Sequence, residues 1–265
     1  MARNAIGRRA GSPALLGVAG FVVFLALLEV IPRAGLVSAR YLPPTSTILA
    51  TLAAQLVDAG FWAAVGHTLA AWALGLGIAF AAGLAVGVVV GSVPVLKELT
   101  SSTIEFLRPI PSVALIPLAV LLFGTDIGST LVLVVYASFW QVLVQVLHGV
   151  VDVDPVAEDT ARSYRLSRWS RIRHVTWPSA LPYVLTGLRL GAAVALILAV
   201  TAELVIGSPG LGQQIAVAQS SNAVPLVYAL VIATGGLGVA VNVGVRALER
   251  AALAWHPSVR SEVPA

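Results

Sequence analysis

Cysteine is absent from this chain of 265 residues, which excludes disulfides, thiolate metal sites and cysteine nucleophiles. Lysine is almost absent as well, since Lys97 is the only one. The residues before it, VPVL, lack the glycines of the phosphate-binding loop Gly-x-x-x-x-Gly-Lys-Ser/Thr. We therefore expect no ATP site of this kind, no catalytic residue, no metal site and no cofactor bound by this chain.

Charged residues are also scarce, at 11%, whereas hydrophobic residues make up 58% of the chain and the mean hydropathy is +0.93. These values lie far outside the range of soluble domains and indicate a protein of the lipid bilayer. The 24 glycines and 15 prolines lie within apolar runs, where close helix packing and helix breaks are tolerated. The basic residues are spread between these runs and form no single basic face, so nucleic-acid binding is not expected.

Apolar runs with little or no charge predict membrane-spanning helices, because about 20 such residues cross a bilayer as a helix. We expect an all-α, polytopic membrane helix bundle of about six transmembrane helices. Their approximate ranges are 13–32, 67–91, 98–126, 127–151, 183–206 and 226–245. The sequences SPGLGQQ and QSSNAVP, between the last two ranges, are polar or rich in glycine. We expect an exposed or re-entrant loop there.

Basic residues set the expected orientation, because they stay on the cytoplasmic side of a membrane. In a six-span arrangement nearly all of them fall on one side: Arg3, Arg8, Arg9, Lys97, the arginines of residues 158–182, Arg246, Arg250 and Arg260. The other side receives only Arg33 and Arg40. We expect both termini and residues 158–182 to be cytoplasmic. A cleaved signal peptide over residues 1–39, ending at Val37-Ser38-Ala39, is an alternative that leaves the later topology unchanged.

Residues 158–182, EDTARSYRLSRWSRIRHVTWPSALP, place five arginines between two apolar runs. Asp154-Pro155 predicts the start of a short helix that runs to about Tyr164, because proline suits the first helical position. A second short helix is expected over residues 167–177, and Pro178 should end it. Two short amphipathic helices joined by a bend would form a docking surface. The simpler alternative is a loop whose arginines face lipid headgroups.

The same strip resembles the EAA loop of binding-protein-dependent ABC import permeases. Asp159-Thr160-Ala161 stand at the Glu-Ala-Ala positions, Ser167-Arg168-Trp169 matches the Ser-Arg-Trp that often follows, and PSALP at 178–182 matches the Leu-Pro ending. The next residues, YVLTGLRL, resemble the branch that imports nitrate, aliphatic sulfonates, taurine and related small compounds. Other segments that fit this branch in order are RPIP (108–111), ALIPL (114–118), FG (123–124), AE (202–203) and GLG (210–212).

This resemblance, which covers residues from about 65 to 255, implies that residues 152–182 form a cytoplasmic two-helix coupling loop docked on an ATPase subunit. The residues expected to couple to the ATPase are Asp159, Thr160, Ala161, Tyr164, Arg165, Ser167, Arg168 and Trp169. Arg165 stands where the family has glycine, and arginine enters the left-handed region only at a cost of about 1 kcal/mol or more. We therefore expect a bend that is differently shaped or slightly strained.

The resemblance also implies partners, a location and a function. The expected partners are two copies of an ATP-binding subunit that holds ATP and Mg²⁺, an extracytoplasmic substrate-binding protein, a second permease copy in a homodimer, and the lipid bilayer. The expected location is the bacterial inner membrane. The expected function is inward transport of a small solute by alternating access, driven by the separate ATPase, and the identity of the solute stays open.

Ionisable residues and glycines in or beside the spans are candidates for a gate or a solute pathway, because charge at that depth usually faces a cavity or a partner. These candidates are Glu105, Arg108, Glu203, Gly210 and Gly212. For the three charged ones, a structural ion pair or gate and direct solute contact both remain open. The second span carries three glycines at four-residue spacing: Gly83, Gly87 and Gly91. They predict close helix packing and not a functional site.

The expected organisation is an N-terminal transmembrane helix with an external segment over residues 1–65, a permease core over 66–255 and a cytoplasmic tail over 256–265. Three prolines predict a break or kink in the third span: Pro109, Pro111 and Pro117. A secondary carrier is an alternative function, but it requires an internal repeat or an ion site at the bilayer midplane, and no convincing repeat is found. A membrane-embedded enzyme is a weaker alternative, because no nucleophile with a base is found.

Overall fold

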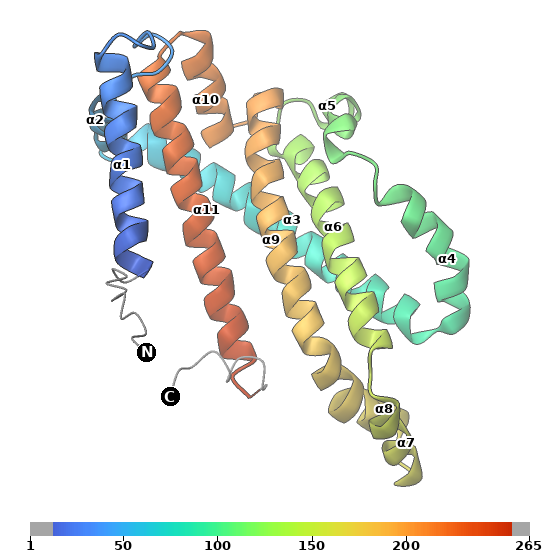
Figure 1. Cartoon of the computed structure of the whole chain (residues 1–265). Coiled ribbons are helices and arrows are strands. Elements are labelled where there is room, and N and C mark those ends of the chain that lie inside the picture. Colours follow the sequence, from blue (N-terminus) through green and yellow to red (C-terminus); the bar gives the residue numbers. More distant parts are fainter. Residues whose placement is uncertain (1–12, 256–265) are drawn as a thin grey trace, which may run out of the picture.

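The computed structural model describes residues 13–255, which form a bundle of helices (Figure 1). The helices and helical turns are α1 (Pro13–Arg33), α2 (Thr45–Gln55), α3 (Ala59–Ser92), α4 (Pro94–Leu107), η1 (Ser112–Leu115), α5 (Ile116–Phe123), α6 (Ile127–Val151), α7 (Pro155–Ser163), α8 (Arg168–Arg171), η2 (Ile172–Thr176), α9 (Trp177–Ile206), α10 (Leu211–Ser220) and α11 (Val224–Ala252). Between residues 13 and 255 there is no β-strand. The predicted all-α fold is confirmed.

Within residues 13–255, five helices are long and apolar enough to cross a membrane: α1, α3, α6, α9 and α11. The fourth predicted span, 127–151, coincides with α6. The predicted break in the third span, 98–126, is confirmed, because α4 and the unit η1–α5 meet at an angle of 81°. The break lies at Arg108–Pro111, where two prolines have no N–H to donate. The bundle has six spans only if this bent pair counts as one.

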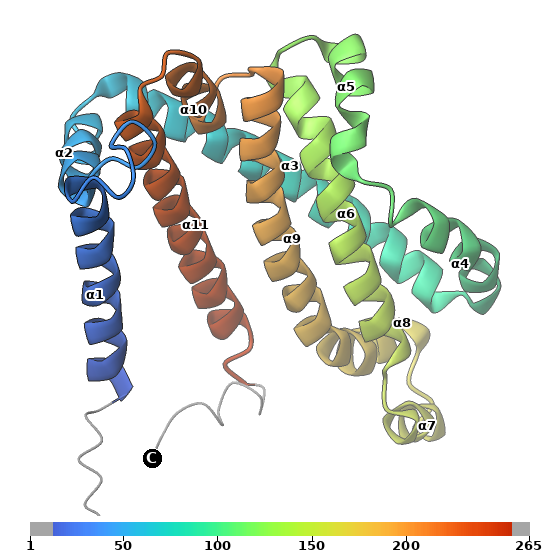
Figure 2. The same ribbon diagram turned by 45° about the horizontal axis from the view of Figure 1, so that its top comes forward.

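The centre of the bundle consists of α3, α6 and α9, which lie side by side (Figures 1 and 2). Their shared core combines large side chains of α3 and α6, such as Leu76 and Leu133, with a row of alanines on α9 that includes Ala195 and Ala199. Small residues at a helix contact let two backbones approach closely, which favours dispersion contacts in a lipid environment. These three helices therefore form the rigid part of the structure.

Glycines on α3 bring it into direct contact with α6, as predicted. A Cβ atom on Gly83, Gly87 or Gly91 would lie 2.9, 2.7 or 3.0 Å from the side chains of Val142, Val146 and Val150, in that order. The four-residue spacing is the same on both helices, so each valine packs against one glycine. The close contact requires glycine at these positions, because a larger residue would force the two helices apart.

The prediction that Pro178 ends a short helix before the fifth span is wrong. The chain stays helical from Trp169 to Ile206, a run of 38 residues. A π-helical turn, η2, lies just before Pro178, and the N–H of Trp177 donates to the carbonyl of Ile172, five residues earlier. The wider turn relieves the clash of the proline ring with the preceding turn. As a result, the predicted second short helix continues directly into α9.

Two further segments contain short helices that were not predicted. The stretch expected as an exposed or re-entrant loop contains the helix α10, and because Leu211, Gly212 and Ala218 are buried, it is not simply exposed. Its buried side packs against α9, α11 and α3. The segment expected only as external, before residue 65, contains α2, which packs against α11. Because helices this short are marginal by themselves in water, both depend on these tertiary contacts.

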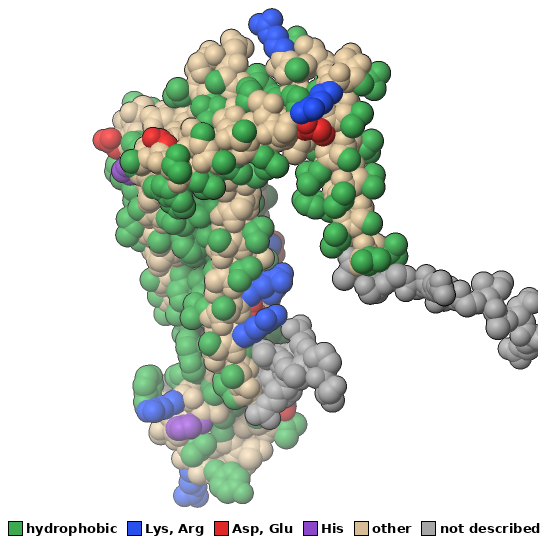
Figure 3. Space-filling view, turned by 90° about the vertical axis from the view of Figure 1, so that its left-hand side faces the viewer, with side chains coloured by type: hydrophobic (Ala, Val, Ile, Leu, Met, Phe, Trp, Pro, Cys, Tyr) green, Lys and Arg blue, Asp and Glu red, His purple; other side chains and the backbone are tan. Residues whose placement is uncertain are grey.

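The helix α1 has few contacts with the rest of the bundle. Figure 3 shows hydrophobic side chains along this helix and an open space beside it. Only 6% of its most apolar 18-residue stretch is buried. It is attached at its last turn, where Glu29 pairs with Arg33 at 2.6 Å and accepts hydrogen bonds from the N–H and the hydroxyl of Ser46. These bonds tie the end of α1 to the start of α2.

The short helices gather at the two ends of the bundle (Figure 1). We call the end that carries α7 and α8 the hairpin end, and α1 begins and α11 ends toward it. The opposite end carries α2, α5 and α10. The two ends are connected by α3, α6, α9 and α11. The start of α1 and the end of α11 therefore lie toward the same end of the bundle as residues 158–171. The predicted basic residues Arg3, Arg8, Arg9 and Arg260 lie outside the described residues.

Candidate functional site

The first candidate site is the hairpin, which comprises α7, α8 and the bend between them (residues 155–171). Its start is as predicted: Pro155 occupies the first turn, and the Asp154 side chain accepts a hydrogen bond from the N–H of Val156 at 2.8 Å. This cap satisfies one of the donors that a helix start leaves free. The sequence Asp-Pro therefore fixes where the hairpin leaves α6.

The bend at the end of α7 has the geometry that glycine normally provides. Arg165 adopts φ +56°, in the left-handed region. The N–H of Leu166 donates to the carbonyl of Ala161 at 3.0 Å, and the N–H of Arg165 donates to that of Arg162 at 2.9 Å. These two bonds form a Schellman motif, the usual way to end a helix with a sharp turn. Arg165 therefore keeps this sharp bend at a strain of about 1 kcal/mol.

An ion pair connects the two helices of the hairpin. Glu158 on α7 lies 3.2 Å from Arg171 on α8, and the same carboxylate lies 3.4 Å from Arg162. The Glu158 and Arg171 side chains are 25% and 22% exposed, so the pair is shielded from water more than a surface ion pair is. The Glu158–Arg171 pair was not predicted from the sequence, because Arg171 lies beyond the bend. Of the two arginines, only Arg162 lies at helical spacing from Glu158.

The predicted coupling residues lie mostly on the exposed surface of the hairpin. Tyr164 and Trp169 are 79% and 70% exposed, and Asp159, Thr160, Arg165 and Ser167 are exposed as well. Ala161 is the exception, because it is buried inside the hairpin. The side chain of Arg168 lies outside the described part of the structure. The exposed aromatic and arginine side chains make this surface suited to protein contact.

The second candidate site, at the opposite end of the bundle, is a buried cluster around Glu203 that we call the clamp. The Glu203 carboxylate, near the end of α9, accepts hydrogen bonds from the hydroxyl of Thr68 at 2.9 Å and from the N–H of Gly212 at 3.0 Å. The Thr68 hydroxyl in turn accepts the N–H of Leu211 at 3.0 Å. Together these bonds join α3, α9 and the start of α10.

The two predicted glycines of this region are required by the clamp. Gly210 packs directly on the Glu203 carboxylate, and a Cβ at Gly212 would lie 2.7 Å from the backbone nitrogen of Leu204. Gly210 also has φ +156°, which side-chain-bearing residues rarely adopt. The sequence pattern GLG therefore belongs with Glu203. The bond to Thr68, 135 positions away, could not be predicted from sequence.

The two other predicted residues do not join the clamp. Glu105 lies on α4 and faces a cavity at the hairpin end, and Arg108 is exposed where α4 ends. The ion pairs found between residues 13 and 255 do not include Glu105, Arg108 or Glu203. An ion pair involving these three residues is therefore not part of this structure. In the same part of the chain, no group of three or more acidic or histidine side chains could hold a metal ion.

Comparison with known sequences gives a consistent set of matches. Residues 77–253 match the family described as "Binding-protein-dependent transport system inner membrane component". The chain is 31% identical over 250 residues to the taurine transport system permease protein TauC of Escherichia coli, covering 92% of this chain and 91% of that protein. It is 30% identical over 236 residues to the putative aliphatic sulfonates transport permease protein SsuC of Bacillus subtilis, covering 89% and 86%.

A more distant sequence relative and two solved structures extend the comparison. The bicarbonate transport system permease protein CmpB of Synechocystis is 27% identical over 251 residues, covering 90% of this chain and 87% of CmpB. An inward-facing MetNI methionine ABC transporter has a chain with a TM-score of 0.60 at 20% identity, covering 71% of this chain and 94% of that one. A chain of an amino acid ABC transporter with histidines has a TM-score of 0.60 at 22% identity, covering 72% and 93%.

Replacing Arg165 with glycine should stabilise the bend. Glycine adopts positive φ without the steric cost that arginine has, so Arg165→Gly should make the turn about 1 kcal/mol more stable. Amide hydrogen exchange at Leu166 should slow by roughly fivefold. Asn222→Gly is the matched control, because Asn222 also has positive φ, at +54°, but asparagine tolerates it. Unchanged or faster exchange at Leu166 would show that the bend is not strained.

Replacing Glu203 with leucine should loosen α10. The change removes the acceptor for Gly212 and Thr68 at a cost of about 1–3 kcal/mol for each buried donor, whereas Glu203→Gln keeps a carbonyl oxygen at that place. Hydrogen exchange over residues 207–223 should rise in Glu203→Leu and stay close to the wild-type rate in Glu203→Gln. Equal exchange in the leucine variant and the wild type would refute the clamp.

Proposed function

The chain belongs to the family of binding-protein-dependent transport system inner membrane components and is the permease subunit of an ABC importer, and we propose that it carries a small sulfonate-type solute inward across the membrane. The relatives named for taurine and aliphatic sulfonates, at 31% and 30% identity, support this solute class. Their alignments extend over about nine-tenths of this chain. The family assignment favours the permease function over the two alternatives, a secondary carrier and a membrane-embedded enzyme.

The hairpin is the proposed docking site for a separate ATP-binding subunit, which would hold ATP and Mg²⁺. The observation that supports this most is the exposed pair Tyr164 and Trp169 beside a bend that is fixed by two backbone hydrogen bonds. Tyrosine, tryptophan and arginine are the residues that contribute most binding energy at protein interfaces. Ala161 contributes differently: because it is buried, it supports the shape of the hairpin and not its surface.

The hairpin is positioned to transmit force across the membrane. From Trp169 the chain stays helical to Ile206, which is roughly 57 Å measured along the helix at 1.5 Å per residue. The clamp then joins the end of α9 to α10 at the opposite end of the bundle. A displacement of the hairpin by the ATP-binding subunit would therefore move α10 as well. Such linked movement of both ends is what alternating access requires.

The two ends of the bundle have different proposed surroundings. The hairpin end, with Lys97 and the arginines of α7 and α8, would lie in the cytoplasm, which is the side that basic residues favour. The opposite end, with α2, α5 and α10, would face an extracytoplasmic substrate-binding protein. The exposed apolar sides of α1 and α11 suit lipid or a second permease copy in a homodimer. We place the assembly in the bacterial inner membrane, with both termini cytoplasmic.

Two alanine substitutions test the docking proposal. Trp169→Ala and Tyr164→Ala should each weaken copurification of the ATP-binding subunit and reduce ATP-driven uptake at least tenfold, because each removes a large exposed aromatic anchor. Tyr41→Ala is the matched control, since Tyr41 is 73% exposed in the loop at the opposite end. The proposal fails if the ATP-binding subunit copurifies equally with all three variants. Equal loss in all three would indicate a folding defect and would also contradict it.

A further inference from the structure

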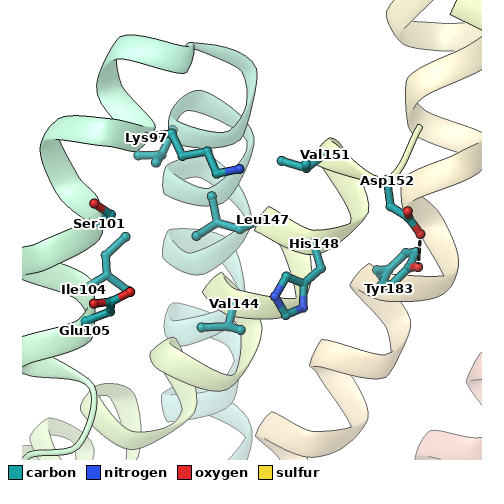
Figure 4. A pocket seen from close by; sticks show the side chains of 11 residues that line it. Lys97, Ser101, Ile104, Glu105, Val144, Leu147, His148, Val151, Asp152 and Tyr183 are labelled. Atoms are coloured by element: carbon teal, nitrogen blue, oxygen red, sulfur yellow. Dashed lines mark hydrogen bonds between the residues drawn. The ribbon is translucent and has the colours of Figure 1, made fainter. Parts of the chain in front are cut away.

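A cavity of about 570 Å³ lies between α4 and α6 at the hairpin end. Val90 at the end of α3 and Tyr183 on α9 complete its lining. Figure 4 shows Lys97, Ser101 and Glu105 on one side of this space and His148 with Leu147 on the other. Neither the predicted coupling surface nor the clamp includes it. The cavity is therefore a separate feature of the permease core.

Three of the cavity's polar groups form a row on α4. Lys97, Ser101 and Glu105 follow one another at four-residue spacing, and all three line the cavity. Successive members of such a row are about 6 Å apart along the helix. The row therefore changes from a positive charge, through a hydroxyl, to a negative charge over about 12 Å. A ligand that lies along it would meet opposite charges at its two ends.

The charged groups of this row are available for a ligand. Between residues 13 and 255, the side chains of Lys97, Glu105 and His148 make no hydrogen bond or ion pair with one another or with other groups. Asp152 is different, because it accepts a hydrogen bond from the Tyr183 hydroxyl. Lys97 and Glu105 are both exposed, so a solute that enters the cavity can reach their charged groups directly.

The helix that carries this row is loosely held. No residue of α4 is buried, and its far end is tied to α6 by one hydrogen bond, from the Tyr136 hydroxyl to the Leu107 carbonyl at 2.7 Å. The break at Pro109 and Pro111 follows directly. The cavity can therefore admit a molecule through a small movement of α4, without disturbing the packed centre formed by α3, α6 and α9.

We propose that this cavity is a solute-binding site and that it takes a small zwitterion with an acidic group at one end and an ammonium group at the other. The acidic group lies beside Lys97, and the ammonium group lies between Ser101 and Glu105. The apolar walls formed by Ile104, Val144 and Leu147 contact the short carbon linker. This inference rests on the proposed function, since it assigns a place and a charge pattern to the transported solute.

The charge pattern explains why a zwitterion is favoured over a simple anion. A sulfonate without an ammonium group would satisfy Lys97 but would leave the Glu105 carboxylate unpaired and facing a like charge. A molecule with both groups pairs both ends of the row, and hydrogen bonds to charged groups contribute about 1.5–3 kcal/mol each. The site should therefore distinguish taurine from ethanesulfonate, which has the same carbon–sulfur skeleton without the amine.

Binding to the purified full-length permease in lipid nanodiscs tests the site without the ATP-binding subunit. Radiolabelled taurine is the probe, and unlabelled ethanesulfonate is the competitor. The wild type should bind taurine at least tenfold more tightly than ethanesulfonate. Glu105→Gln should weaken taurine binding roughly tenfold and leave ethanesulfonate binding unchanged or tighter, because the like charge is removed, so that the discrimination is lost. Lys97→Gln should weaken the binding of both ligands.

The control variant is Glu98→Gln, which removes the same charge from the same helix at an exposed position outside the cavity. It should bind taurine as the wild type does. The inference is overturned if wild-type permease does not bind taurine, or if Glu105→Gln weakens both ligands equally. Copurification of the ATP-binding subunit is measured separately, so absence of taurine binding together with normal copurification refutes this site and leaves the docking proposal intact.

Discussion

The unbroken helix from Trp169 to Ile206 is the feature on which the rest of the structure depends, because it joins the hairpin to the buried carboxylate of Glu203. Its continuity depends on one local adjustment, the π turn before Pro178, which accommodates a residue that would otherwise break the helix. If the chain were flexible at this point, a force on the hairpin would bend the joint before it moved α10. The π turn is therefore a mechanical requirement of the fold.

The helices around α9 differ in how firmly they are held, and the difference matches their proposed roles. Glycines and alanines bring α3, α6 and α9 into close contact, so these helices move as one packed unit. By contrast, α1 is attached mainly at its last turn, and α4 has no buried residue. A structure with a rigid centre and one loosely held helix beside a charged cavity can transmit a displacement while still opening a path for a solute.

The features that were predictable from sequence depend on residues that are close together in the chain. An apolar run defined α6 to the residue, Asp154-Pro155 located the start of α7, and the glycine spacing of α3 indicated its close contact. The clamp could be predicted only in part, because the bond between Glu203 and Thr68 joins positions 135 residues apart. The apolar contacts of α2 and α10 and the π turn at Ile172–Thr176 likewise depend on tertiary packing and not on local pattern.

The central claim is that the hairpin and α10 move together because α9 is rigid, and the absence of cysteine makes it directly measurable. A single cysteine at Ser179 or Val217, spin-labelled, gives one distance between the two copies of the proposed homodimer, assembled with the proposed ATP-binding subunits. On ATP binding, the labels at 179 should approach one another and those at 217 should move apart. Approach at 179 with no change at 217 would contradict the account, because α9 would then bend instead of transmitting the movement.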